Sequence, residues 1–409
     1  MRIRILALVA VLAGASGATM GQTVCVSPTD DLYGLGVDVG GVCGQASFDT
    51  AQDLIDGLET SQLDDVNANY DGTQIANMEI FFNSLPITLT FPNSGFTGNG
   101  AALVFSIPEL GINETFVGTD RDASQDLLED YLKDSGVIAD IMKYQAANSP
   151  HSPISGPGGV IPTAVASDFG EVFNTMPSEQ ETEAANLVGA GIGLSSLSVD
   201  GRDTTITTVP LSYAIRNSID PRRQLVFSMP ITVADSEGAK AYSFSLGVGY
   251  RFPINEAWTL TPAVRYGLTG SEDFATVAGV ASATLASTYA LRFDAFDMAI
   301  GNMIGYYTTT KIDAGDYSFD PGIDNTVLRN GVMLSQPVTV GGKRLAIEYS
   351  LIDTRYLGTE IYVDNTQELG ITVGTNRSAF ASRSYLRGGL NLLKGKDTTG
   401  ISLNIGYWF

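Results

Sequence analysis

The chain has few of the residues from which catalytic and metal centres are usually built. Its 409 residues include one histidine, two cysteines and two tryptophans. One histidine and two thiols cannot complete the common zinc or iron–sulfur ligand sets. We therefore expect no metal site and no cofactor. No apolar run reaches the roughly 18 residues that a membrane-spanning helix needs, which excludes a helical membrane protein.

Basic residues are almost absent from the first half of the chain. Residues 22–185 contain 25 Asp and Glu but only Arg121, Lys133 and Lys143 on the basic side, whereas residues 186–409 have 20 acidic and 18 basic residues. Two regions with such different charge balances indicate two structural units. The acidic unit is a poor partner for nucleic acid, and we expect none to bind.

The first residues have the pattern of a secretory signal. Arg2 and Arg4 precede an apolar run over 5–12 and small residues up to Ala18. This predicts a cleaved signal peptide within 1–21, and therefore an exported protein. In an oxidising compartment, Cys25 and Cys43 are expected to form one disulfide.

Residues 22–147 predict an acidic α+β domain. We expect 22–46 to be irregular, helices over 47–60 (capped by Asp49) and 122–147, and β-strands within 78–92, 101–108 and 111–117. Residues 148–185 follow as a Pro/Gly-rich linker over 148–163 and a candidate pore helix in the acidic stretch 166–185.

From residue 186 onward the polarity alternates with the period of two that is typical of strands. Tyr242, Phe244 and Leu246, for example, alternate with Ser243 and Ser245. Twelve such segments follow one another, near 186–200, 203–217, 222–235, 240–253, 257–269, 274–290, 292–309, 326–338, 343–357, 361–376, 379–394 and 398–409. One face is large and apolar and the other mostly small or polar, which predicts a transmembrane antiparallel β-barrel over 186–409.

The connections between these segments suggest an orientation. The longest, 310–325, follows an odd-numbered segment, whereas those after even-numbered segments are short. Because barrels of this kind have short periplasmic turns, we expect the connections after even-numbered segments to lie on the periplasmic side.

The last strand carries a recognisable pattern. Ile401, Leu403, Ile405, Tyr407 and Phe409 occupy alternate positions up to the final residue. The segment resembles the closing strand of Gram-negative outer-membrane barrels, in which these positions form the signal for the barrel-assembly machinery. The resemblance implies that machinery and outer-membrane lipid as partners, and the outer membrane as the location. We expect this strand to pair with the first one, near 187–198.

Twelve strands preceded by a short acidic segment resemble the autotransporter type of barrel, whose lumen holds a helix connected to an upstream passenger. Residues 120–133 also look like a short region found ahead of barrels in some proteobacterial relatives. Unlike typical members, this chain has no long repetitive passenger.

Alternation directs several ionisable side chains into the predicted lumen. Because a charged group at mid-membrane depth on the lipid face is costly, we interpret them as lumen residues. They are Arg251, Arg265, Asp297, Arg329, Glu348, Glu368 and Arg387. Two interpretations fit them, a solute-sorting pore lining and simple mutual pairing. Acidic residues 179–183 are a candidate partner for the inward arginines.

Catalysis finds little support. His151, the one available general base, lies in the linker, and no G-x-S-x-G motif occurs. The acidic pairs Asp294/Asp297 and Glu272/Asp273 lie at strand ends. Four aspartates in the longest connection could bind calcium but lack the EF-hand spacing. They are Asp313, Asp316, Asp320 and Asp324.

Three functions fit these patterns. The first is a non-enzymatic outer-membrane barrel of autotransporter type that displays or encloses its own N-terminal region. The second is a porin, open to small solutes, whose N-terminal region is a plug or a periplasmic domain. The third is a surface hydrolase carried on a barrel.

Overall fold

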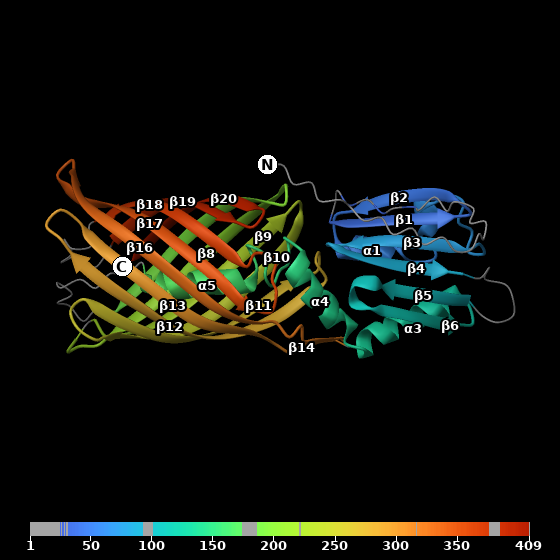
Figure 1. Cartoon of the computed structure of the whole chain (residues 1–409), viewed down its shortest axis with the longest axis horizontal. Helices are drawn as coiled ribbons and strands as arrows, with labels where there is room; N and C mark the ends of the chain where they lie inside the picture. Colours follow the sequence, from blue (N-terminus) through green and yellow to red (C-terminus); the bar gives the residue numbers. More distant parts are fainter. Residues whose placement is uncertain are drawn as a thin grey trace, which may run out of the picture.

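The protein consists of an N-terminal α+β domain placed at one mouth of a closed β-barrel (Figure 1). The computed structural model describes residues 25, 27, 29, 32–92, 101–173, 186–220, 222–315, 317–375 and 385–408. The predicted signal peptide, residues 179–183 and Phe409 lie outside these residues.

The N-terminal domain is built on a six-stranded antiparallel sheet with the order β2-β1-β3-β4-β5-β6. Its elements are β1 (Tyr33–Val39), β2 (Val42–Phe48), α1 (Ala51–Gly57), α2 (Leu63–Val66), β3 (Ala76–Phe82), β4 (Leu85–Phe91), β5 (Ala101–Ile107), the 3-10 turn η1 (Pro108–Leu110), β6 (Ile112–Gly118), α3 (Arg121–Asp134) and α4 (Val137–Asn148). Alternate residues of β3, β4 and β5 are buried, so one face of the sheet forms the apolar core.

Three expectations for this domain were wrong in detail. The segment 22–46 is not irregular, because β1 and β2 form a hairpin whose positive-φ turn is provided by Gly40 and Gly41. The first helix begins only at Ala51, and Thr50 caps it by accepting a hydrogen bond from the Asp53 amide. The long helix is split into α3 and α4, because Gly136 adopts a left-handed conformation (φ 76°).

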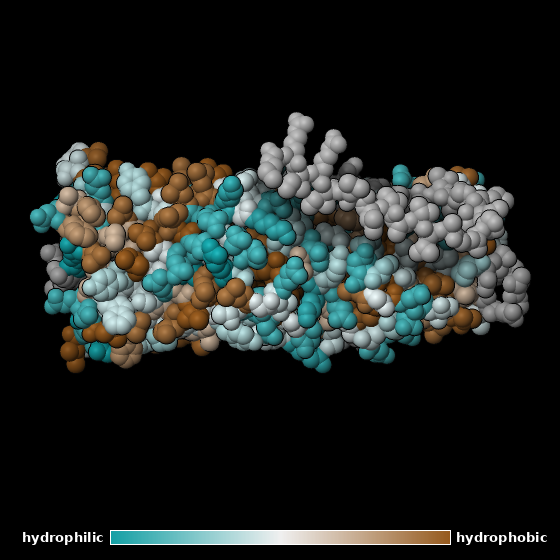
Figure 2. Space-filling view, viewed as in Figure 1, coloured by the Kyte–Doolittle hydropathy of each residue, from teal (hydrophilic) through white to brown (hydrophobic). Residues whose placement is uncertain are grey.

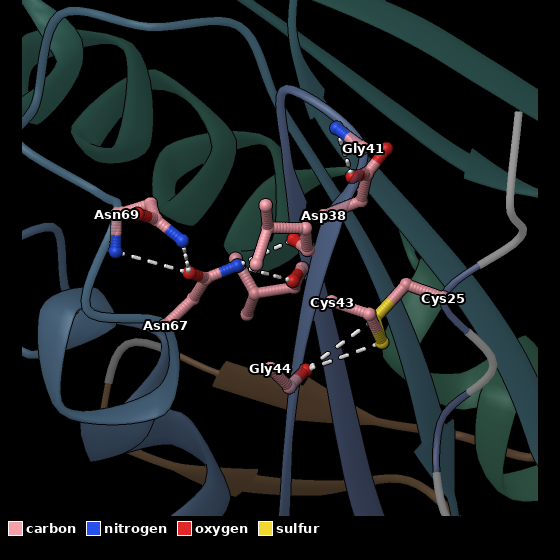
Figure 3. The surroundings of a disulfide bond; sticks show 9 residues. Cys25, Asp38, Gly41, Cys43, Gly44, Asn67 and Asn69 are labelled. Carbon is pink, nitrogen blue, oxygen red and sulfur yellow. Dashed lines mark hydrogen bonds between the residues drawn. A yellow bond between two sulfur atoms is a disulfide. The ribbon is translucent and has the colours of Figure 1, made fainter.

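Cys25 and Cys43 are joined by a disulfide that ties the segment before β1 to strand β2 (Figure 3). Beside it, the Asn67 side-chain amide donates to the carbonyl oxygens of Val37 (2.9 Å) and Val42 (2.7 Å). The β1–β2 hairpin is therefore held both covalently and by a buried side chain.

The barrel closes through twelve antiparallel strands, which confirms the fold class. Its strands are β7 (Leu187–Val199), β8 (Arg202–Arg216), β9 (Gln224–Ser236), β10 (Ala239–Pro253), β11 (Trp258–Ser271), β12 (Thr276–Arg292), β13 (Asp297–Thr310), β16 (Asp324–Val340), β17 (Lys343–Gly358), β18 (Asn365–Thr375), β19 (Tyr385–Gly395) and β20 (Thr398–Trp408). The last strand pairs with the first, from Thr398↔Val199 to Trp408↔Gly189, as expected.

The barrel has two distinct ends. Connections 200–201, 237–238, 272–275, 311–323, 359–364 and 396–397 lie at the end that faces the N-terminal domain, called here the domain end. Strand β7 begins and β20 ends at the opposite end, called here the terminal end, together with connections 217–223, 254–257, 293–296 and 341–342. The short hairpin β14 (Ile312–Ala314) and β15 (Tyr317–Phe319) lies within the longest connection.

The longest described connection, 311–323, lies at the domain end as predicted, but the other connections do not distinguish the two ends by length, so that part of the orientation argument was wrong. Connection 217–223 at the terminal end is longer than 200–201, 237–238 and 396–397 at the domain end. The shortest turns are tight because positive φ angles at Asp200–Gly201 and Glu237–Gly238 suit two-residue hairpins.

The outer face of the barrel is apolar. Every barrel strand exposes at least one large apolar side chain, and Figure 2 shows hydrophobic residues spread over this surface. The N-terminal domain exposes only five among its described residues, namely Val42, Ile55, Ile75, Val117 and Leu127. None of the described helices has the length and apolar character required to cross a membrane.

Candidate functional site in the barrel lumen

A helix, α5 (Val160–Phe173), lies inside the barrel (Figure 1). It contacts strands β9 to β13 and β16, most extensively β11, β12 and β13. Its Val165, Phe169 and Phe173 are buried in one apolar cluster with barrel residues such as Met303 and Val327. The helix therefore packs against one wall of the lumen, the packed wall, formed by β10 to β13.

Glycines on the lumen face make room for this helix. A Cβ atom added to Gly301 would overlap Cδ2 of Phe173, and one added to Gly331 would lie 3.1 Å from Cζ of Phe169. Two aromatic rings of α5 thus occupy space that larger barrel residues would fill. The close fit explains why glycine recurs on this inward face.

One buried ion pair connects α5 to the packed wall. The Arg265 Nε atom donates to the Asp168 carboxylate at 2.7 Å, and the two side chains are only 2% and 3% exposed. The Tyr307 hydroxyl donates to the other Asp168 oxygen at 2.9 Å. Arg265 also donates to the hydroxyls of Ser245 and Ser228, so this buried charge pair has several hydrogen-bond partners.

Arg251 makes the second polar contact with the helix. Its Nη2 group donates to the Glu171 carbonyl oxygen at 2.9 Å, and its Nη1 group to the Gln224 side chain at 3.0 Å. The inward arginines Arg251 and Arg265 therefore contact α5. Their expected partners, residues 179–183, lie outside the described residues.

The remaining part of the lumen is open. A cavity of about 480 Å³ lies between α5 and the opposite wall, called the open wall, formed by β17 to β20 and β7. Along β20 its lining extends from Thr398 at the domain end to Gly406 near the terminal end. The cavity therefore follows most of the length of the lumen.

Two ion pairs line this cavity. Arg329 Nη2 lies 2.8 Å from the Glu368 carboxylate, and its guanidinium lies over the Phe169 ring of α5. Arg387 pairs with Glu348. Asn391, Asn404 and Ser402 add amide and hydroxyl groups, so the lining combines charged and polar groups with apolar side chains.

Six of the seven charged residues assigned to the lumen thus fall into two groups. Arg251 and Arg265 lie on the packed wall, and the other four line the cavity. The seventh, Asp297, has the inward parity of β13 and lies at the terminal end, where it is the cross-strand neighbour of Arg292.

The lumen helix begins earlier than the candidate pore helix over 166–185, and sequence reasoning did not identify its Asp168, Phe169 or Phe173. The Pro/Gly-rich composition of 148–163 hid its first turn. One signal could have revealed it, because Ile161, Val165 and Phe169 recur at i, i+4 spacing and are all buried.

The N-terminal domain is docked on the domain end of the barrel. The backbone carbonyl oxygen of Asp273, in the β11–β12 turn, accepts hydrogen bonds from the Tyr33 hydroxyl (2.8 Å) and the Ala51 amide (2.9 Å). The barrel residues Ala239 and Phe274 belong to the same buried apolar cluster as the core of the domain. The two parts therefore share a continuous core.

The segment 149–159 is not an extended linker, as the sequence suggested, but is packed between the domain and the barrel. Nearly all its residues are buried. It has little regular secondary structure, and the hydroxyl groups of its serines form hydrogen bonds with neighbouring residues. Ser149 donates to the Asn83 side chain at 2.7 Å, and Ser155 to the Ala146 carbonyl oxygen at 2.8 Å. This segment occupies the mouth of the barrel at the domain end.

His151 lies in this packed segment and is only 6% exposed. Its Nδ1 atom lies 3.2 Å from the Thr204 hydroxyl, while Nε2 has no hydrogen-bond partner among the described residues. Burial, with a smaller contribution from the nearby Arg202 charge, lowers the pKa of His151 to about 4. The side chain is therefore neutral and inaccessible near pH 7.

The acidic residues considered for catalysis or for metal binding are dispersed. In the described part of the chain, no three His, Cys, Asp or Glu side chains are grouped so that they could hold a metal ion. The Asp273 carboxylate accepts a hydrogen bond from the Lys240 amide, and Asp324 accepts one from the Tyr306 hydroxyl. Asp316 lies outside the described residues.

No protein-family model and no curated protein sequence matches this chain. Among solved structures, the translocator domain of the autotransporter NalP from Neisseria meningitidis is 13% identical, with 61% of this chain and 97% of that chain covered and a TM-score of 0.47. The β-domain of the Bordetella autotransporter Brka is 14% identical, with 56% and 99% covered and a TM-score of 0.45. The KdgM porin in complex with oligogalacturonate is 10% identical, with 54% and 98% covered and a TM-score of 0.34.

Proposed function

We propose that this protein is an outer-membrane barrel of autotransporter type that displays its own N-terminal domain on the cell surface. The path of the chain carries the proposal. The N-terminal domain lies at the domain end, α5 runs inside the barrel away from it, and β7 then begins at the terminal end. A chain that passes through the lumen in this way places its two ends on opposite sides of the membrane.

The outer surface supports insertion in a lipid bilayer. Exposed aromatic rings lie near both ends of the strands, as in the interfacial girdles of membrane barrels. Tyr213, Phe252, Trp258, Tyr289 and Tyr407 lie near the terminal end, and Tyr242, Tyr266 and Tyr306 near the domain end. Ile401, Leu403 and Ile405 of the assembly signal point outward between these levels.

The proposal includes a non-enzymatic role. His151 is the one histidine of the chain, and its burial and low pKa make it unsuitable as an accessible general base. The shared core between domain and barrel favours a domain that stays attached over a passenger that is released.

Surface labelling of intact cells tests the proposal. An epitope tag inserted next to Asp71, an exposed residue of the N-terminal domain, should be accessible to antibody and protease. A matched tag in the 341–342 turn at the terminal end should become accessible only after the outer membrane is permeabilised. The reverse pattern would place the domain in the periplasm and contradict display.

The cavity beside α5 favours a second candidate function, a narrow channel for small solutes. The full-length protein would then show a small conductance in planar lipid bilayers. Asn404→Trp, which places a large ring in the cavity, should reduce this conductance, whereas Leu403→Trp on the outer face should not. Equal conductance in both variants and the wild type would exclude this path.

A further inference from the structure

A row of polar side chains crosses the otherwise apolar outer face of the barrel. Cross-strand pairing connects Asn302, Asn330, Asp353, Gln367, Lys394 and Thr399 through six neighbouring strands. All six have outward parity, and we call them, with the neighbouring Arg355, the polar row. Figure 2 shows a hydrophilic band across the apolar surface of the barrel.

The polar row has a sharp boundary. The next outward row toward the terminal end contains only apolar residues over the same strands, namely Ile300, Val332, Leu351, Leu369, Leu392 and Ile401. Lys394 and Gln367 lie close to the domain end of their strands, whereas Asn302 lies well inside β13, with Ile304 and Tyr306 between it and the domain end. The polar row therefore descends from the rim of the barrel into the apolar belt.

Some members of the polar row form hydrogen bonds with one another. Asn302 donates to Asn330 at 2.7 Å. The Asp353 carboxylate accepts hydrogen bonds from Gln367 (3.0 Å) and Arg355 (3.1 Å). Lys394 is exposed and forms no ion pair within the described part of the chain. These seven residues include two cations and one carboxylate, and the same pairing continues from Thr399 through Ser198 to Asp203 at the rim of β8.

Polar groups on a lipid-facing surface are costly unless they meet a polar partner. The partner here must reach from the headgroup level into the upper part of the apolar belt, and must carry negative charge where Lys394 and Arg355 lie. An anionic glycolipid has this arrangement, with phosphates at the headgroup and hydroxyl and carbonyl groups where the acyl chains begin.

We propose that the polar row is a binding surface for a phosphorylated glycolipid of the outer leaflet. This rests on the proposed function, because it requires the domain end to face the outside. Lys394 and Arg355 contact phosphate oxygens, for which charge-assisted hydrogen bonds are favourable. Asn330 and Asn302 donate to and accept from the hydroxyl and carbonyl groups that lie deeper.

The experiment measures binding of lipid A that carries two phosphates to the full-length, delipidated protein in nonionic detergent, by native mass spectrometry. The double variant Arg355→Gln/Lys394→Gln should bind lipid A at least about tenfold more weakly. Each cation near a membrane surface strengthens the binding of an anionic lipid by somewhat less than a factor of about ten. Asn302→Leu/Asn330→Leu should weaken binding less, because it removes no charge. The matched control Lys343→Gln/Arg344→Gln removes two cations at the terminal end and should leave binding unchanged.

Each alternative gives a different result. The proposal of a phosphate-specific site would be overturned if the Lys343/Arg344 control lost as much affinity for lipid A as the Arg355/Lys394 variant. It would also be overturned if dephosphorylated lipid A or phosphatidylethanolamine bound as tightly as lipid A with two phosphates. Inorganic phosphate that competes as well as lipid A would indicate anion binding without lipid recognition, which also overturns the proposal. A lipid-free dimer that dissociates in Asn302→Leu/Asn330→Leu would assign the polar row to contacts between copies. These outcomes are independent of the surface-labelling test, which decides the orientation.

Discussion

The N-terminal domain and the barrel arrange the same kinds of residue in opposite ways. The domain buries Tyr33, Leu54 and Leu103 in a core and carries its excess of acidic groups on the surface. The barrel exposes large apolar residues on every strand and places arginines and carboxylates inside. The domain thus removes its apolar side chains from water by packing them together, whereas the barrel turns its apolar side chains toward lipid.

Two ion pairs illustrate the difference. Glu129 and Lys133 form an ion pair at 2.8 Å on α3 of the domain, where Glu129 is 56% exposed. Asp168 and Arg265 form one at 2.7 Å in the lumen, where both side chains are almost fully buried. The distances are nearly equal, so the two pairs differ mainly in burial and in the additional hydrogen bonds of the lumen pair.

The largest expected effect is the loss of the lumen pair. Asp168→Ala leaves the Arg265 charge buried without its carboxylate, and removing one partner of such a pair typically costs about 3–5 kcal/mol. Glu129→Ala should give no measurable change, because an exposed i, i+4 pair contributes little. Chemical unfolding of the full-length protein in detergent micelles measures both.

Two further variants separate loss of charge pairing from loss of shape. Asp168→Asn keeps the size of the side chain and the hydrogen bond from Tyr307, and should cost less than Asp168→Ala. An equal loss for Glu129→Ala and Asp168→Ala would show that the lumen is as hydrated as the domain surface, and would end the contrast between the two parts.

The barrel was predictable from sequence because its signal is periodic and local. Alternation such as Tyr242, Phe244 and Leu246 identifies a strand and its lipid-facing side at once, and twelve repetitions determine closure. The same parity argument placed charged residues such as Arg251 and Glu348 in the lumen.

The contents of the lumen were not predictable in the same way. In the sequence, Asp168 resembles any helical carboxylate, because its partners Arg265 and Tyr307 lie 97 and 139 residues away and meet it only in the folded protein. The packed segment 149–159 was interpreted as a linker, because Pro, Gly and Ser carry no periodicity from which burial can be inferred. Long-range pairing and non-periodic packing are thus the parts that a single sequence does not reveal.

The disulfide gives a test confined to the domain. Replacing Cys25 and Cys43 by serine opens a loop between residues 18 positions apart, which by the chain-entropy model costs about 3 kcal/mol. Thermal unfolding should show a lower midpoint for the domain, while the barrel, which holds no cysteine, keeps its own transition. A shift of both transitions together would indicate that the shared core makes them one cooperative unit.

The junction between the two parts should be sensitive to pH through His151. Its pKa is lowered to about 4 in the folded protein, against roughly 6.5 in an unfolded chain, so the unfolded state binds more protons between these values. Stability is then fully present above about pH 6.5 and decreases as the pH falls toward 4, by about 2 kcal/mol at pH 5. The hydroxyl groups of Thr204 and Ser236 beside the ring do not titrate in this range.

His151→Asn is the control for that prediction, because it removes the titrating group and keeps a side chain able to bond Thr204. The variant should lose the component of the pH dependence between 6.5 and 4 while the contribution of surface carboxylates remains. An unchanged profile would mean that the pKa of His151 is the same in the folded and unfolded states, and would contradict this prediction.

The smallest expected effect compares two inward glycines of the barrel. A methyl group at Gly301 would overlap the Phe173 ring of α5, whereas one at Gly406, which lines the cavity, would meet no atom within 4 Å. Gly301→Ala should therefore destabilise the protein by about 1 kcal/mol or more, since overpacking outweighs the gain in backbone entropy. Gly406→Ala should be neutral or slightly stabilising, because only the entropy term remains. Equal effects at both positions would mean that α5 does not stay on the packed wall. The barrel interior would then be loosely packed, unlike the core of the N-terminal domain.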